Sequence, residues 1–223
     1  MLTRPTPLSP RRSVLFAALA LSLWLPFGAA LADTTDAQFE AAFRTFQAGQ
    51  KGDSGAVERA ADEFSELLKA DPGNPMLMAY AGSATAMKAT TTMLPWKKMS
   101  YAEDGLAQID KALALLQPAH DTAMLYHSPV SLQTRFTAAS TFLGMPGFFN
   151  RGARGTKLLA DVQASPLMAQ AAPGFQGAVL MAAAKQATKE LRTADARREL
   201  NDVVQRGLPQ AEAAKVQLQG LPQ

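Results

Sequence analysis

The 223-residue chain contains no cysteine, and this absence excludes several kinds of chemistry at once. Without a thiol the protein has no disulfide bonds, no thiolate nucleophile and no cysteine ligands for zinc. A lipid anchor on a cysteine beside a signal cleavage site is excluded for the same reason. An exported domain of this composition must depend on its hydrophobic core for stability.

Histidine is nearly as scarce, because the chain has only two. His120 and His127 lie in one polar segment with Asp121, and a set of His and Asp side chains can bind a metal. No third strong ligand and no glutamate lie in that segment, so we interpret both histidines as exposed loop residues. The sequence gives no reason to expect a metal or a cofactor.

The sequence patterns of common catalytic sites are also missing. There is no nucleophile elbow, phosphate-binding loop, dinucleotide fingerprint or metalloprotease motif. The glycine-rich stretch 147–155 does not follow a predicted strand, so its glycines do not indicate a phosphate site. Carboxylates such as Glu63 and Glu103 are expected on solvated helix faces rather than in the cleft that acid catalysis needs. We therefore expect a protein without enzymatic activity.

The excess of positive charge is confined to the N-terminal segment. The whole chain has a formal net charge of +3, and the charged residues before Asp33 are Arg4, Arg11 and Arg12. Removing these three from the 22 basic residues leaves 19, which equals the 19 acidic residues. A neutral chain has no net attraction for nucleic acids or for a membrane surface, and we expect no nucleic-acid partner.

The N-terminal segment has the three parts of a secretory signal peptide. Arg11 and Arg12 provide a basic start, and an apolar run follows over residues 14–32. The run ends in Ala30-Leu31-Ala32, a small-x-small cleavage pattern, before polar residues begin at Asp33. The segment therefore directs export to the periplasm or out of the cell.

Cleavage is expected to remove residues 1–32 and to leave residues 33–223 as a single domain. The alternative is an uncleaved anchor helix, because the apolar run is almost long enough to span a bilayer. Pro26 and Gly28 near the end of the run favour cleavage, so we expect no stable membrane insertion afterwards. The arginine pair is compatible with both the general secretory route and the twin-arginine route.

Composition and spacing predict an all-α protein made of stacked antiparallel helical hairpins. Ala, Leu and Gln are frequent while Ile and Tyr are scarce, a balance that favours helices. Apolar residues recur at intervals of three and four, proline and glycine separate the runs, and no alternating run has the length of a strand. We expect seven or eight helices, the main ones over 36–48, 54–70, 75–92, 100–117, 128–143, 156–164, 176–191 and 194–206.

Three boundaries within this pattern rest on local signals. Residues 94–99 and 147–155 are predicted to be loops. Ser100 and Glu103 have the spacing of a capping box, which would begin the helix after the first loop. Pro173 and Gly174 are expected to interrupt a short helix that starts at Ser165.

Part of the chain resembles a tetratricopeptide repeat, which is a repeated helical hairpin. Residues 60–75 are similar to its second helix and exit turn, and residues 105–115 give a weaker second match. The resemblance rests on Ala60, Phe64, Leu67, the turn 71–75, Gly82 and Ala84.

The match departs from the repeat in two ways. Met78 replaces the usual aromatic residue, and the two matching stretches lie about 45 residues apart where the repeat has a period of about 34. The resemblance covers residues 39–118 at most. It implies a helical-hairpin fold and a role in interaction, and it carries no catalytic residues.

Two segments combine aromatic and cationic side chains, a mixture that is enriched at binding hot spots. The alternative is that their aromatic rings fold back as lids on the core. Arg135 stands alone on an apolar helix face and should pair with a carboxylate or cap a neighbouring helix, unless it contacts a ligand. The candidate partner-binding residues are Trp96, Lys97, Lys98, Arg135, Phe148, Phe149, Arg151 and Arg154.

Together these observations favour a non-enzymatic, exported scaffold or adaptor that binds a protein partner in the bacterial cell envelope. An accessory role beside a membrane transporter suits such a domain by analogy. The alternative is a periplasmic module that binds a small molecule or a peptide in a Met- and Phe-lined pocket between hairpins.

Overall fold

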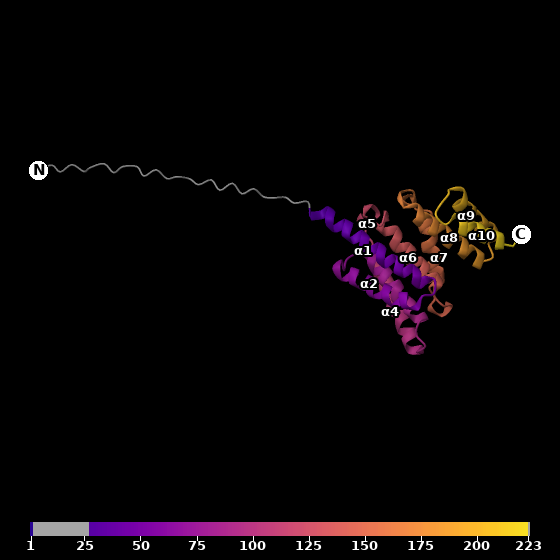
Figure 1. Ribbon diagram of the computed structural model, residues 1–223, viewed down its shortest axis with the longest axis horizontal. Helices are drawn as coiled ribbons and strands as arrows, with labels where there is room; N and C mark the ends of the chain where they lie inside the picture. The colour runs from indigo at the N-terminus through magenta and orange to yellow at the C-terminus, as the bar shows by residue number, and fades with distance from the viewer. Residues whose placement is uncertain (2–26, 223) are drawn as a thin grey trace.

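A computed structural model of the chain describes Met1 and residues 27–222, with side-chain surroundings from Asp36 onward (Figure 1). Most of the expected signal segment, residues 1–32, therefore lies outside the described residues. The first described helix, α1 (Phe27–Gln50), begins before the expected cleavage position and extends through the predicted helix 36–48.

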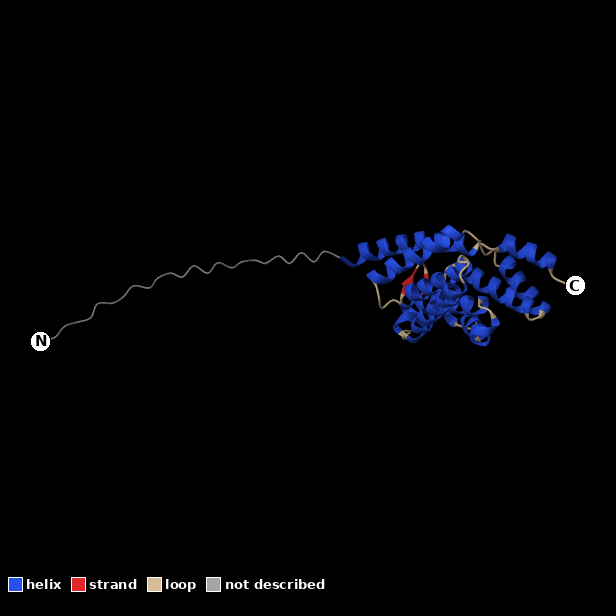
Figure 2. Cartoon of the chain, turned by 90° about the horizontal axis from the view of Figure 1, so that it is seen from below, coloured by secondary structure: helices blue, strands red, loops and turns tan. Residues whose placement is uncertain are grey.

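The described residues are almost entirely helical, which confirms the all-α prediction (Figure 2). Four more α-helices follow α1 in the N-terminal half: α2 (Ser54–Ala70), α3 (Pro75–Met87), α4 (Pro95–Ala114) and the single turn α5 (Ala119–Thr122). The C-terminal half contains α6 (Val130–Gly144), α7 (Gly152–Gln163), α8 (Pro173–Lys189), α9 (Thr193–Gln205) and α10 (Ala211–Gly220). Among the described residues the ten α-helices exceed the expected seven or eight, because the expected ranges include neither the single turn α5 nor the C-terminal helix α10.

Short elements of other kinds connect these helices. The 3-10 turns are η1 (Lys88–Thr90), η2 (Gly147–Phe149) and η3 (Pro166–Gln170). A two-residue antiparallel ladder, β1 (Met124–Leu125) with β2 (Ser128–Pro129), pairs Met124 with Pro129 and Leu125 with Ser128. The turn between these strands needs a left-handed backbone at Tyr126 (φ 49°) and His127 (φ 57°). A ladder this short leaves no alternating pattern in the sequence.

Helix α2 has the predicted bounds because strong signals stand at both of its ends. The side chain of Asp53 accepts a hydrogen bond from the backbone N–H of Ala56 at 3.0 Å. At the other end, Asn74 begins the next helix by accepting from the N–H groups of Met76 (3.0 Å) and Leu77 (3.2 Å). Such caps satisfy backbone donors that have no partner within the helix.

Helix α4 begins earlier than the predicted loop 94–99 allowed. Leu94 is extended, with ψ of 114°, and Pro95 occupies the first helical position. This arrangement is favourable because a residue before proline avoids the helical region, and the proline lacks an N–H that would need a partner. Ser100 consequently lies inside the helix and donates to Asp104 at 3.1 Å instead of acting as a cap.

Two further predictions about helix starts were wrong for related reasons. Pro173 begins α8 and does not interrupt a helix. The predicted loop 147–155 is only partly a loop, because η2 occupies residues 147–149 and α7 already begins at Gly152. Proline and glycine were read in both cases as breaks, whereas they also occur at the first positions of helices.

Neighbouring helices pack in pairs along the chain, α1 with α2, α3 with α4, α6 with α7 and α8 with α9. In Figure 1 the chain progresses from α1 and α2 at one end of the body to α9 and α10 at the other. Helix α3 also packs against α2 and α6, and nearly all of its residues are buried. It is therefore the central helix that joins the two halves.

Helices α3 and α4 cross closely at two glycines. A Cβ atom on Gly82 would lie 2.7 Å from the carbonyl oxygen of Gly105, and one on Gly105 would lie 2.6 Å from the backbone nitrogen of Ala86. Both distances are shorter than van der Waals contact. Only glycine therefore fits at these positions, and this crossing fixes how α4 sits on the central helix.

The hydrophobic core consists of local clusters. The N-terminal cluster is aromatic, and in it the rings of Phe64 and Tyr80 stack with centroids 5.0 Å apart. A second cluster includes Leu132, Leu159 and Val179 from α6, α7 and α8. A third joins α8, α9 and α10.

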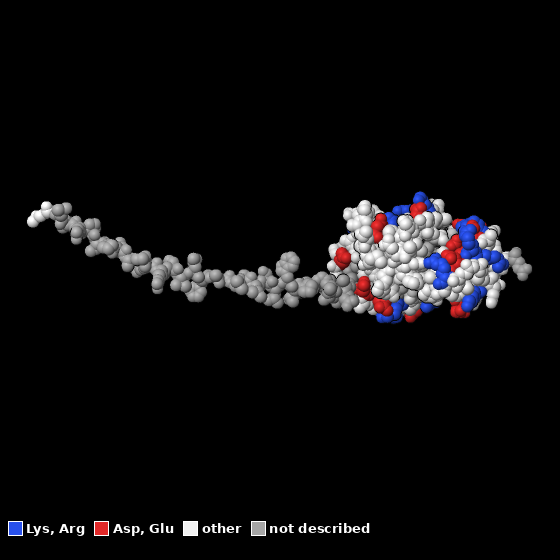
Figure 3. Space-filling model, turned by 90° about the horizontal axis from the view of Figure 1, so that it is seen from above, with Lys and Arg blue, Asp and Glu red and all other residues white. Residues whose placement is uncertain are grey.

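The surface charge is unevenly distributed. Acidic and basic side chains lie close together over the end formed by α9 and α10, whereas much of the face seen in Figure 3 carries no charged side chain.

Candidate functional site

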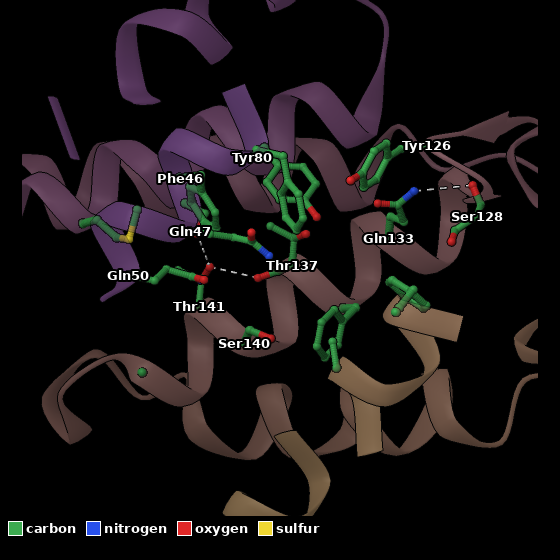
Figure 4. Close-up of a pocket in the computed structure, with 18 of the residues that line it drawn as sticks. Phe46, Gln47, Gln50, Tyr80, Tyr126, Ser128, Gln133, Thr137, Ser140 and Thr141 are labelled. Carbon is green, nitrogen blue, oxygen red and sulfur yellow. Dashed lines mark hydrogen bonds between the residues drawn. The ribbon is translucent and has the colours of Figure 1, made fainter. Parts of the chain in front are cut away.

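A groove of about 870 Å³ opens between α1 and α3 on one side and α6 and α8 on the other. The β1–β2 turn closes part of its edge with Tyr126 and His127. The volume lies in the upper part of the range found for ligand sites. In Figure 4, Gln47 and Gln50 of α1 point toward the face of α6 that carries Thr137, Ser140 and Thr141.

The wall supplied by α6 is polar. Gln133, Thr137, Ser140 and Thr141 lie at intervals of four, three and one, which places them on one face of the helix. The Thr141 hydroxyl donates to the carbonyl oxygen of Thr137 at 2.8 Å and lies 2.8 Å from the Ser83 hydroxyl of α3. Since one hydroxyl has one proton, Ser83 donates to Thr141 and keeps acceptor capacity toward the groove.

Aromatic rings form the rest of the lining. Phe43 and Tyr126, whose ring centroids lie 5.6 Å apart, belong to the side formed by α1 and the β1–β2 turn. Phe136 of α6 and Phe175 of α8 pack edge to face at 5.3 Å on the other side. Met87 and Met145 also line the groove. The groove thus combines apolar surface with hydroxyl and amide groups.

Tyr80 sits at the boundary between the N-terminal cluster and the groove. Burial raises the pKa of its phenol to about 12, and a hydrogen bond with Thr137 acts in the opposite direction with a smaller effect. The desolvated phenol favours its neutral form. Tyr80 is therefore an uncharged hydrogen-bonding group at physiological pH.

Fixed charge is almost absent from the groove. Among the described lining residues Glu40 is the one carboxylate, and none is lysine or arginine. An anionic ligand would find no cation to replace its hydration. The lining therefore suits a ligand, or a segment of a ligand, that is uncharged and partly apolar.

Hydrogen bonds that cross between the two halves hold one end of the groove. The backbone N–H of Ala172 donates to the carbonyl oxygen of His127 at 3.0 Å and to the Ser128 hydroxyl at 3.1 Å. The Gln133 amide donates to the carbonyl oxygen of Leu125 at 2.6 Å. These bonds fix the left-handed turn and give the groove a preformed edge.

The candidate residues at the start of α4 lie outside the groove. Trp96 is 67% exposed, and Lys97 and Lys98 are exposed beside it. The indole therefore does not fold back as a lid on the core. None of these three side chains lines the groove.

The second group of candidates is engaged within the protein. Arg151 forms an ion pair with Asp110 at 2.8 Å, and Arg154 pairs with the same carboxylate. Both guanidinium groups also lie over the Phe142 ring, at 5.3 and 5.2 Å from its centroid. Their charges hold α7 against α4, and the Arg154 side chain remains 45% exposed while it does so.

The remaining candidates have separate positions. Phe148 is 67% exposed, whereas Phe149 packs against the core cluster of α4 and α6. Arg135 lies 3.7 Å from Asp121, which is the carboxylate pairing expected for it. The candidate residues therefore do not converge on one site, and none of them lines the groove.

The two histidines make different contacts. The His120 ring accepts a hydrogen bond from the backbone N–H of Gln117 at 2.9 Å, while His127 lines the groove. Within the described residues no three side chains of metal-ligating type lie together. Nor does any described helix combine the length and apolarity that crossing a membrane requires.

Sequence reasoning missed the polar face of α6, although its signal was present. The sequence predicted a helix over residues 128–143 but assigned no role to Gln133, Thr137, Ser140 and Thr141, which recur with helical spacing. A polar stripe beside an apolar stripe on a buried helix indicates either a water-filled space or a binding surface.

Comparisons with protein-family models, curated proteins and solved structures give no match for this chain. The fold class therefore rests on the structure itself, which consists of packed pairs of neighbouring helices.

Proposed function

We propose that this chain is a non-enzymatic binding protein of the bacterial cell envelope, exported through its N-terminal segment, that holds an extended peptide segment of a partner protein in the groove. The observation that carries the proposal is the preformed groove, lined by aromatic rings and uncharged hydrogen-bonding groups. In this proposal the protein acts as an adaptor, and the groove is the surface that binds its partner.

The geometry of α6 favours a peptide over a compact ligand. Its polar face runs from Gln133 to Thr141, about 12 Å along the helix axis. Such a length accommodates about three or four residues of extended chain. Amide and hydroxyl side chains can pair with both the N–H and the C=O groups of a peptide backbone, and the aromatic surfaces can receive apolar side chains.

The resemblance to tetratricopeptide repeats supports the same role. It assigns a small residue to Gly82, a position where α3 crosses α4 at short distance. Helical hairpins of this type stack into concave surfaces that bind extended segments. A partner that belongs to a membrane transporter would fit an exported accessory protein, and this part of the proposal rests on analogy.

A small molecule is the second candidate occupant, because the volume of about 870 Å³ also lies within the range of small-molecule sites. The two candidates differ in what they leave attached to the protein after crosslinking. A peptide occupant yields a conjugate with a defined segment of another protein, whereas a small molecule yields none.

The test is photocrosslinking in intact cells from a reactive amino acid placed at Gln50, which lines the groove. The matched control places the same amino acid at Gln217, an exposed position on α10. We expect a conjugate with one envelope protein from position 50 and none from position 217. Mass spectrometry of the conjugate should locate a single uncharged segment.

A blocking variant makes the test sharper. Ser140→Phe fills the groove and should lower the yield of the conjugate by at least about tenfold, because losing one or two ligand hydrogen bonds removes about 1.4 kcal/mol or more. Ser65→Phe on the exposed face of α2 is the control and should leave the yield unchanged. Equal yields from positions 50 and 217, or a yield unaffected by Ser140→Phe, would refute the proposal.

A further inference from the structure

The first turns of α4 and the residues just before them carry an unusual concentration of exposed apolar side chains. Of the nine large hydrophobic residues that the structure describes as exposed, four fall between positions 93 and 99. They are Met93 (87% exposed), Leu94 (38%), Trp96 (67%) and Met99 (42%). With Lys97 and Lys98 they form what we call the α4 tip, which lies at the lower corner of the molecule in Figure 1.

The charge of the α4 tip is of one sign. Between residues 89 and 102 the charged side chains are Lys97 and Lys98, and there is no carboxylate. Neither lysine has an ion-pair partner among the described residues, whereas the nearby Lys88 binds Glu58 at 2.8 Å. The tip is therefore a local site of positive charge on a chain that carries no net charge after Arg4, Arg11 and Arg12 are removed.

The chemical character of these side chains matches a lipid–water interface. Tryptophan has an apolar ring and an N–H that needs a polar partner, and it concentrates at the level of lipid headgroups. Lysine can keep its ammonium group at the headgroups while its methylene stem follows the apolar surface. The methionine and leucine side chains add apolar area that would otherwise stay in water.

We propose that the α4 tip attaches the protein to an anionic lipid surface. The apolar side chains of Trp96, Met93 and Met99 enter the boundary of the acyl region, and Lys97 and Lys98 pair with lipid phosphates. The attachment is peripheral and needs no membrane-spanning helix. It is independent of the groove's occupant, although Met87 and Thr90 of the groove lining directly precede the tip.

The test uses the processed chain recovered from exporting cells. The sequence has two tryptophans, and the expected cleavage removes Trp24 with residues 1–32, so Trp96 is the single tryptophan of the processed chain. We expect the protein to float with vesicles of phosphatidylglycerol and phosphatidylethanolamine, and not with vesicles of phosphatidylcholine. The emission of Trp96 should shift to the blue on binding, and added salt should reverse both effects.

Two matched double variants isolate the role of charge at the tip. Lys97→Ala with Lys98→Ala should lower the partition coefficient about 25-fold, because each lysine near an anionic surface contributes about a fivefold factor. Lys185→Ala with Lys189→Ala removes the same charge from α8 and should change binding less than about twofold. Trp96→Ala should also abolish flotation, since it removes the largest apolar group.

Three results would overturn this inference. The protein could remain in solution with anionic vesicles, bind phosphatidylcholine equally well, or lose binding equally in the two double variants. Crosslinking from position 96 to one envelope protein, without any flotation, would assign the tip to a protein partner instead. Failure of the tip experiment leaves the groove proposal standing, because the crosslinks from position 50 do not depend on lipid.

Discussion

Gly105→Ala should destabilise the protein, although alanine is the better helix former. Gly105 lies within α4, where alanine gains up to about 1 kcal/mol in helix propensity. In the folded protein, however, the new Cβ would lie 2.6 Å from the backbone nitrogen of Ala86 and close to the carbonyl oxygen of Gly82. Ordinary contact begins near 3.4 Å, so the two helices must separate.

The size of the effect follows from that separation. Opening a packed interface by 0.5–1 Å forfeits about a quarter to a half of each dispersion contact across it. Leu106, Ile109 and Ala112 are buried on this part of α4 and lose contacts together. We estimate a gross loss of about 3–5 kcal/mol, and about 2–4 kcal/mol after the gain in propensity is subtracted.

Urea denaturation followed by circular dichroism measures this difference. The midpoint should fall without a change in the slope, and the melting temperature should drop by about 2–4 °C for each kcal/mol. Gly144→Ala is the control, because Gly144 also lies in a helix and a Cβ there meets no atom within 4 Å. A Gly105→Ala protein as stable as the wild type would show that the helices do not cross as closely as described.

Two further predictions concern titration and an ion pair. Since the pKa of Tyr80 is raised from 10.0 to about 12, its stabilising effect is complete below pH 10 and is lost as pH rises through 12. Relative to Tyr80→Phe, the wild type should lose about 1.4 kcal/mol of unfolding free energy by about pH 11, measured in urea, and a constant difference would contradict the burial of the phenol. Asp110→Ala frees Arg151 and Arg154 and should cost about 1–2 kcal/mol at low ionic strength. Because the pairs are partly exposed, salt should shrink that difference, and insensitivity to salt would refute an electrostatic origin.

The helices that the sequence predicted best are those with a strong signal at each end. For α2 these signals are the Asp53 cap and the turn 71–75, and the predicted bounds agree with the structure. The all-α class followed from composition and spacing, which depend on many residues together. Local signals of this kind act over a few residues and can be read without knowledge of the fold.

The start of α4 could not be predicted because two local signals compete there. Ser100 and Glu103 have capping-box spacing, while Pro95 is also suited to a first helical position. The structure uses the proline, and Ser100 bonds Asp104 within the helix. Because α4 starts at Pro95 instead of residue 100, it gains more than one helical turn, and this added segment forms most of the exposed α4 tip.

The groove could not be derived from the sequence because its walls come from distant segments. Gln47 and Thr141 line the same space although more than 90 residues separate them. The resemblance to a helical repeat covered only α1 to α4 and could not place α6. Most candidate residues were therefore predicted in two loops that combine charge and aromatic rings, whereas the groove's lining comes mainly from helices α1, α3, α6 and α8 and from the β1–β2 turn.

The local make-up of the hydrophobic core has a consequence for the order in which the chain can fold. The N-terminal cluster draws on residues from Phe39 to Val130, and it includes nothing from α7 to α10. A chain made from its N-terminus can therefore complete this cluster before α8 has been synthesised. The cluster of α8, α9 and α10 closes last and needs only those helices. Each part of the growing chain can thus bury its own apolar residues soon after synthesis. This shortens the time during which exposed apolar surface can aggregate.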